Sequence, residues 1–226
     1  MAEKLILSWS GGKDSAMALY EIQQRQDYEV VTLLTTLSGE YDRVSMHGVC
    51  RVLLEQQARS LGLPLEQVIL AKSHTNEEYE AKMQATLSKF QKLGVSCVAF
   101  GDIFLTELRK YREDNLAKIG MKAIFPIWDR STAELIKTFV NLGFKSVVTC
   151  VDAKILDRAF AGRIINASFL AELPPNIDPC GENGEFHSFV FDGPIFKKSI
   201  SLVIGEVVLR DSLYFCDLLP CWQELE

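Results

Sequence analysis

The sequence is poor in features that mark several common classes of protein. Its six cysteines include no CxxC pair, which disfavours a zinc ribbon and a thioredoxin-type redox site. No apolar run approaches the roughly 20 residues that a membrane-spanning helix requires, and the first residues, MAEK followed by LIL, do not form a signal-peptide pattern. We therefore expect a cytoplasmic protein that has no membrane partner.

Basic residues are also scarce relative to acidic ones. Lys and Arg number 24 against 30 Asp and Glu, so the net charge is −6. An acidic surface repels the phosphates of nucleic acid, so nucleic-acid binding is not expected. Hydrophobic residues (48%) and charged residues (24%) stand at ordinary globular values, which disfavours a disordered chain. A chain of 226 residues can form one large domain, or a main domain with a smaller appendage.

Runs typical of strands alternate with runs typical of helices through about the first two-thirds of the chain. The expected strands are 4–9, 29–36, 68–71, 95–100, 123–127 and 146–151, and the expected helices are 15–26, 48–61, 75–93, 104–119 and 131–142. This alternation predicts βαβ crossovers, and hence a mostly parallel sheet of five or more strands with helices on both faces. Beyond about residue 173, prolines and glycines break the pattern, and strand-like runs follow at 186–191 and 199–209. We therefore predict an α/β fold with a smaller, β-containing C-terminal domain.

A short string, SGGKDS, lies between the first expected strand and the first expected helix. Ligands bind at the carboxyl ends of parallel strands, and glycines let backbone N–H groups approach an anion closely. The start of the helix adds unpaired N–H donors and a positive dipole, while Lys13 adds a charge. A plain glycine turn with Lys13 and Asp14 in solvent is the alternative, but the string and its location favour a polyphosphate site. The predicted loop residues are Ser10, Gly11, Gly12, Lys13, Asp14 and Ser15.

Two other phosphate-binding motifs do not fit this string. A Walker A loop requires Ser or Thr after its Lys, where this chain has Asp14, and the dinucleotide fingerprint GxGxxG is absent. The string instead resembles the SGGxDS signature of the PP-loop ATP pyrophosphatases. That resemblance implies that the loop binds the β,γ-pyrophosphate of ATP and that ATP is cut at its α-phosphate. It also implies roles in catalysis for Lys13 and Asp14, with Asp14 as a ligand of Mg²⁺.

A second group of polar residues occurs at 180–194, CGENGEFHSFVFDGP. Asn183-Gly184 is a strong signal for a hairpin turn, so an ordinary surface hairpin with solvated Glu182 and Glu185 is one reading. Two acids and a His beside glycines, near the start of a strand, would also suit binding of magnesium or an amine. Both readings remain open on the residues alone.

Taken together, the loop with its preceding Trp9 and the run Gly181–Phe186 resemble the diphthine–ammonia ligase family, in its bacterial-type branch. The resemblance covers essentially the whole chain, including FPIW at 125–128 and FAGR at 160–163. The second motif of that family usually reads GEGGE, then Tyr or Phe, then ET, whereas this chain has Asn183, His187 and Ser188 at its third, seventh and eighth positions. These departures leave the identity of the acid substrate open.

The resemblance implies an adenine-nucleotide α-hydrolase fold of the HUP or Rossmann-like kind. Residues 1–130 would form the PP-loop ATP-binding α/β domain, and residues 131–226 a C-terminal, substrate-side α+β domain. The implied partners are ATP, ammonia and a carboxylate-bearing substrate, free or carried on a protein, and a homo-oligomer is left open. In the implied reaction ATP yields AMP and pyrophosphate, and the carboxylate is activated as an acyl-adenylate for amidation, with Glu182 and Glu185 joining Lys13 and Asp14 in catalysis.

Two other functions that would use the same loop remain as alternatives. An RNA-modifying PP-loop enzyme would adenylate a base oxygen, and it predicts a basic surface and usually a pair of catalytic cysteines. A nucleotide-binding sensor without turnover is the other alternative, and the intact Lys13 and Asp14 argue against it.

Several isolated residues are further candidates. His47 and Asp102 follow expected strands at the edge that carries the loop, so we predict that both bind ATP, although a helix-entry role for His47 is nearly as compatible with the pattern. Trp128 and His187 are predicted on the substrate side, with core packing as the alternative for Trp128. Arg112 is expected on a solvated face of its helix.

Overall fold

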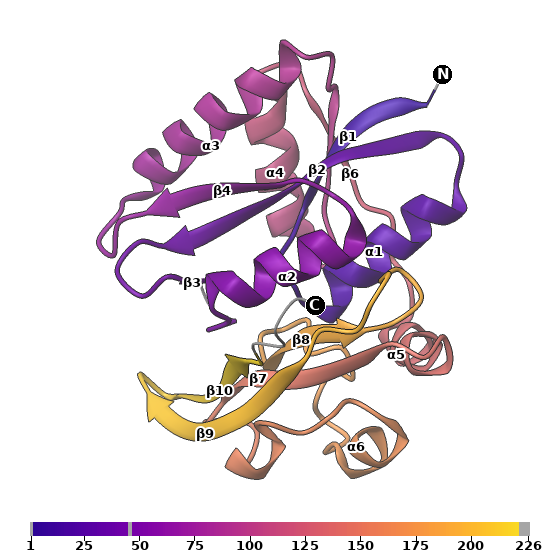
Figure 1. Cartoon of the computed structure of the whole chain (residues 1–226), viewed down its shortest axis with the longest axis vertical. Coiled ribbons are helices and arrows are strands. Elements are labelled where there is room, and N and C mark those ends of the chain that lie inside the picture. The colour runs from indigo at the N-terminus through magenta and orange to yellow at the C-terminus, as the bar shows by residue number, and fades with distance from the viewer. Residues whose placement is uncertain (1, 45–46, 222–226) are drawn as a thin grey trace.

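The computed structural model describes residues 2–44 and 47–221, and the strands of the first half of the chain form one sheet, sheet A (Figure 1). Its strands are β1 (Glu3–Ser8), β2 (Tyr28–Ser38), β3 (Arg43–Val44), β4 (Leu65–Leu70), β5 (Cys97–Ala99) and β6 (Lys122–Ile124). The five strands in the order β4-β2-β1-β5-β6 are parallel, and only the short β3 runs antiparallel, beside the end of β2. Successive strands are added on one side of β1 up to β4 and on the other side from β5, so the topological switch point lies between β1 and β5.

Helices cover both faces of sheet A. They are α1 (Lys13–Gln24), α2 (Arg51–Leu61), α3 (Asn76–Gln91) and α4 (Thr106–Ala117). Successive residues of a strand point to opposite faces, so Leu5 and Leu7 of β1 pack into the core on the side of α1 and α2, while Ile6 packs with α3 and α4. The unbroken apolar run of β1 therefore reflects a strand that is buried on both faces.

The second half of the chain forms an antiparallel sheet, sheet B, in the order β8-β7-β10-β9. Its strands are β7 (Lys145–Asp152), β8 (Phe186–Asp192), β9 (Leu202–Arg210) and β10 (Leu213–Pro220), and the helices of this half are α5 (Thr132–Asn141) and α6 (Ala167–Glu172). Figure 1 shows α1 and α2 between the two sheets, and one hydrophobic core joins Met17 and Leu53 of these helices to Val147 and Phe189 of sheet B. None of the helices in the described ranges is both long and apolar enough to cross a membrane.

The structure confirms the predicted α/β fold with a parallel sheet and a smaller β-containing C-terminal part. Three expectations need correction. The strand at 146–151 does not continue the parallel alternation but belongs to antiparallel sheet B, and the strand β10 was not foreseen. The Asn183-Gly184 turn is no hairpin, because the described residues just before it, 173–180, contain no strand with which β8 could pair across the turn.

The position of the domain boundary remains a prediction. Sheet A ends at Ile124 and sheet B begins at Lys145, with α5 between them.

Candidate active site

A cavity of about 430 Å³ opens at the carboxyl edge of sheet A, at the switch point. This volume falls within the roughly 300–1,000 Å³ that is usual for small-molecule sites. Its walls come from the loops after β1 and β5, the start of α1, the carboxyl half of β2, the helices α3 and α4, and the turn before β8 together with the start of that strand. Residues far apart in the sequence that meet in this lining include Ser10, Lys13, Thr36, His47, Tyr79, Asp102, Arg112, Glu182 and His187.

The loop after β1 has the geometry of an anion site. Gly11 adopts a φ of +80°, and Gly12 is the N-cap of α1 with no side chain capping the helix. The N-cap residue therefore supplies no acceptor of its own to the first N–H groups of the helix. Two serine hydroxyls accept long hydrogen bonds from these groups: Ser10 Oγ from Gly12 N at 3.2 Å and Ser188 Oγ from Lys13 N at 3.3 Å.

Lys13 and Asp14 form an ion pair at the mouth of this loop. Lys13 is only 4% exposed, and its Nζ lies 2.8 Å from Asp14 Oδ2. Burial alone lowers the pKa of Lys13, but the neighbouring Asp14, helped by Cys180 and Glu182, outweighs burial, and the pKa lies above its usual value. Burial raises the pKa of Asp14, against the effect of Lys13. The loop therefore holds a charged lysine where a polyphosphate would lie.

Glu182 joins the turn before β8 to the loop after β5. Its Oε1 accepts a hydrogen bond from Ile103 N at 2.7 Å, and the residue lines the cavity. Burial is the main cause that raises the pKa of Glu182 to about 7, and the charges of Asp14 and Asp102 add to it, although the Ile103 N–H and Lys13 oppose the shift. This carboxyl group is consequently able to gain or lose a proton near neutral pH.

Glu185 lies in a different setting from Glu182. It is 4% exposed, it is not part of the cavity lining, and its carboxylate holds the turn together. Oε1 accepts hydrogen bonds from Asp178 N and Asn183 Nδ2, both at 3.0 Å, and Oε2 accepts one from Asn183 N at 2.9 Å. The structure thus gives Glu185 contacts that shape the turn, and its predicted part in catalysis remains a prediction.

Two histidines lie side by side in the cavity wall. The rings of His47 and His187 have centroids 4.6 Å apart, and His47 Nδ1 lies 3.3 Å from Ser188 O, so we assign the hydrogen to Nδ1. Burial lowers the pKa of His47 to about 4, with Lys13 adding to the effect. Burial likewise holds the pKa of His187 well below its usual value, helped by His47 and Lys13. Both rings are therefore neutral at pH 7 and can both donate and accept hydrogen bonds.

Arg112 differs from its expected place on a solvated helix face. It lines the cavity, its Nε lies 2.6 Å from Asp102 Oδ2, and its guanidinium lies 4.3 Å from the centroid of the Phe100 ring. Helix α4 packs against β6, and this brings Arg112 over Phe100 and Asp102 in the loop after β5, a placement that spacing along the helix could not reveal. Asp102 lines the cavity, as expected, and its carboxylate is paired with Arg112. Trp128 lies outside the lining, stacked on Arg109 at 4.6 Å, so its substrate-side role remains a prediction without a contact to support it.

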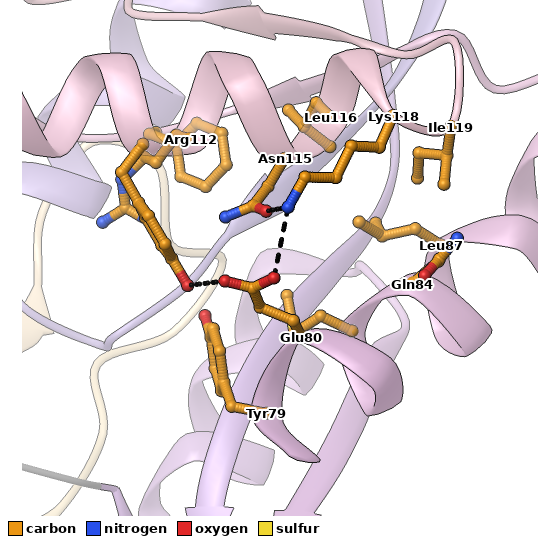
Figure 2. Close-up of a pocket in the computed structure, with 12 residues that line it drawn as sticks. Tyr79, Glu80, Gln84, Leu87, Arg112, Asn115, Leu116, Lys118 and Ile119 are labelled. Atoms are coloured by element: carbon orange, nitrogen blue, oxygen red, sulfur yellow. Dashed lines mark hydrogen bonds and ion pairs between the residues drawn. The ribbon is translucent and has the colours of Figure 1, made fainter. Parts of the chain in front are cut away.

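A second, smaller cavity of about 70 Å³ lies between α3 and α4 and shares Tyr79, Met83, Phe100 and Arg112 with the larger one. Figure 2 shows Lys118 reaching from the end of α4 toward Glu80 of α3, at a distance of 3.2 Å. This ion pair joins the two helices, and the four shared residues form the wall between the two cavities. Tyr79 and Met83 belong to the helix expected at 75–93, and apolar residues at helical spacing carry no sign of a ligand site.

Comparison with known proteins places both halves of the chain in related families. Residues 3–123 match the family model described as diphthamide synthase N-terminal domain, and residues 131–218 match the one described as diphthamide synthase C-terminal domain. The diphthine–ammonia ligase of Danio rerio is 26% identical over 224 residues, which cover 89% of this chain and 87% of that protein. For the diphthine–ammonia ligase of Homo sapiens the identity is 25% over 228 residues, covering 90% of this chain and 84% of that protein. The diphthine–ammonia ligase of Schizosaccharomyces pombe is 27% identical over 228 residues, but the match covers only 38% of its length.

Proposed function

The chain belongs to the diphthamide synthase family, and from this premise we propose that it is an ATP-dependent ligase that amidates a carboxylate with ammonia. The relatives whose names state an activity are diphthine–ammonia ligases, which supports amide formation. The observation that carries the proposal is that the Ser10–Ser15 loop and the Gly181–Phe186 turn contribute walls to one cavity at the switch point.

In this proposal the loop binds the β- and γ-phosphates of ATP. The N–H groups at the start of α1 and the charged Lys13 receive them, with the hydroxyls of Ser10, Ser15 and Ser188 close by. Phosphate oxygens are stronger acceptors than the two serine hydroxyls that now take the long bonds from the loop, because they carry charge. Lys13 then stabilises the charge that develops on pyrophosphate as the bond to the α-phosphorus breaks.

Magnesium fits the residues of the site. Proteins usually hold this ion through one or two carboxylates together with substrate phosphates, and Asp14 is the carboxylate next to the loop. Within residues 2–44 and 47–221, no group of three or more His, Cys, Asp or Glu side chains is arranged to hold a metal without a substrate. When bound, the ion neutralises phosphate charge.

The chemistry proposed at the α-phosphate has two steps. The substrate carboxylate attacks the α-phosphorus and pyrophosphate leaves, and ammonia then attacks the acyl carbon and AMP leaves. Ammonium has to lose a proton to become a nucleophile, and the pKa of about 7 suits Glu182 to hold ammonium and accept that proton. Phe186, His187 and Ser188 of β8 line one side of the cavity, and in this proposal they limit the access of water to the acyl-adenylate from that side.

The test is to identify the products formed from ATP. The protein is incubated with ATP, magnesium, ammonium and a panel of carboxylic acids, and AMP with pyrophosphate is expected. Lys13→Ala should lower kcat/KM by about ten-fold to a hundred-fold, the equivalent of a lost charged hydrogen bond of about 1.5–3 kcal/mol. The exposed Lys110, paired with Asp114 on α4, provides the control Lys110→Ala, which should leave turnover unchanged. Formation of ADP and phosphate alone, or full turnover by the Lys13 variant, would contradict the proposal.

A further inference from the structure

Gln57 of α2 is a fully buried amide that joins three separate segments of the chain. Its Nε2 donates to Gly11 O at 3.0 Å and to Val190 O at 2.6 Å, and its Oε1 accepts from Trp9 Nε1 at 2.8 Å. The residue is 0% exposed. A primary amide has two N–H donors and one carbonyl acceptor, so both donors and the acceptor of this side chain are in use.

The orientation of this amide is set by Trp9. An indole nitrogen can only donate, so the amide oxygen has to face Trp9 and the NH₂ group has to face the two carbonyls. The flipped orientation would bring the amide oxygen against Gly11 O and Val190 O, with no hydrogen between them. Methionine has a similar length but no donor, so it can replace the shape of Gln57 and not its hydrogen bonds.

The contact acts on the residue that gives the phosphate loop its shape. Gly11 has a φ of +80°, and its carbonyl also accepts a hydrogen bond from Val190 N at 2.9 Å. With two donors on this carbonyl, the peptide after Gly11 is held with its oxygen toward Gln57 and β8. Gly12 and Lys13 line the cavity whereas Gly11 and Gln57 do not, so the same peptide orientation presents the loop N–H groups to a ligand.

We propose that Gln57 is a positioning residue of the ATP site, which holds the phosphate loop in its anion-binding shape and fastens β8 of the C-terminal sheet to it. The inference rests on the proposed function, in that ATP is taken as the ligand of the loop. It adds that ATP affinity depends on a side chain that does not line the cavity and on a strand of the second sheet.

The decisive variant is Gln57→Met. It leaves Val190 O without its amide donor, Trp9 Nε1 without its acceptor, and Gly11 O with the single donor Val190 N, so the loop peptide is held less firmly. We expect the Kd for ATP with magnesium to rise about ten-fold, the equivalent of about 1.4 kcal/mol, which is the scale of one lost hydrogen bond. Hydrogen exchange of the peptide that spans the loop should become faster.

Thr32→Val provides a matched control. Thr32 is 2% exposed, lies in β2 outside the cavity lining, and donates to Pro64 O at 3.1 Å. This variant also loses a buried hydrogen bond with little change of shape, so it measures what general destabilisation does to ATP affinity. Its Kd and loop exchange should match those of the unaltered protein.

The outcomes separate the two proposals. An unaltered protein that fails to bind ATP would overturn the proposed function. An unaltered protein that binds ATP, together with a folded Gln57→Met variant whose Kd and loop exchange equal those of Thr32→Val, would overturn the positioning role. Should Gln57→Met not fold, Gln57→Asn keeps the amide on a side chain one methylene shorter. It should give a smaller rise in Kd with faster loop exchange, and unchanged values for both would likewise overturn the inference.

Discussion

Glu182 lines the cavity, accepts one backbone hydrogen bond and has a strongly raised pKa. Its pKa rises from 4.5 to about 7 in the folded protein, chiefly through burial. The folded state therefore binds the proton more tightly than the unfolded state, and this group's contribution to stability falls as pH rises from about 4.5 to about 7. Above that window the native protein contains a partly buried negative charge.

Glu182→Gln should remove this pH dependence while retaining an acceptor for the Ile103 N–H. We expect the variant to equal the unaltered protein near pH 4 and to exceed it by about 1 kcal/mol at pH 8, less than the full conversion of the pKa shift because the group is partly solvated. Urea denaturation across this pH range measures the difference. Glu206→Gln, the same substitution at an exposed position of β9, serves as the matched control. A constant difference at all pH values would contradict the prediction.

At the scale of elements, the turn from Asp178 to Glu185 sets the position of Glu182 relative to sheet A. The buried Glu185 carboxylate accepts three hydrogen bonds within this turn. In Glu185→Gln, an NH₂ group replaces one acceptor oxygen and faces N–H donors. We expect the free energy of unfolding, measured with urea, to fall by about 2–3 kcal/mol, the scale of hydrogen bonds to a charged group.

The same variant should separate binding from ligation. ATP affinity should remain within about two-fold, because the loop contacts are intact, whereas ligation should fall as Glu182 loses its position. Glu107→Gln, an exposed change at the start of α4, should alter neither quantity. A Glu185→Gln variant with unchanged stability and full ligation would show that the turn keeps its shape without this carboxylate.

At the scale of the whole molecule, the two sheets are joined too extensively to unfold separately. One hydrophobic core runs from α1 and α2 into sheet B, and Ser60 at the end of α2 exchanges hydrogen bonds with the backbone of Lys197 and Lys198. We therefore expect a single thermal transition, with calorimetric and van't Hoff enthalpies that agree. Two resolved thermal transitions, one for the unfolding of each sheet, would contradict this expectation.

The local sequence by itself determined most elements of sheet A and the phosphate loop. Apolar runs of strand length, helical spacing and the glycines of SGGKDS depend on neighbours in the chain, so β1, α1 and the loop between them were predictable. The second motif, Gly181–Phe186, also predicted functional residues around Glu182. It could not distinguish Glu182, which faces the cavity, from Glu185, which holds the turn, because the two carboxylates differ only in their contacts.

Only the tertiary structure decided which distant residues complete the site. Gln57, Arg112 and Ser188 reach the cavity or its loop through contacts 10 to 175 residues apart in sequence. In the sequence each appears as an ordinary polar residue of a helix or strand, since local spacing specifies a face but not the partner that packs on it. For the same reason, the sequence could not predict that β7 and β10 belong to an antiparallel sheet. Strand pairing is settled by which apolar faces bury each other, and that is a property of the folded chain.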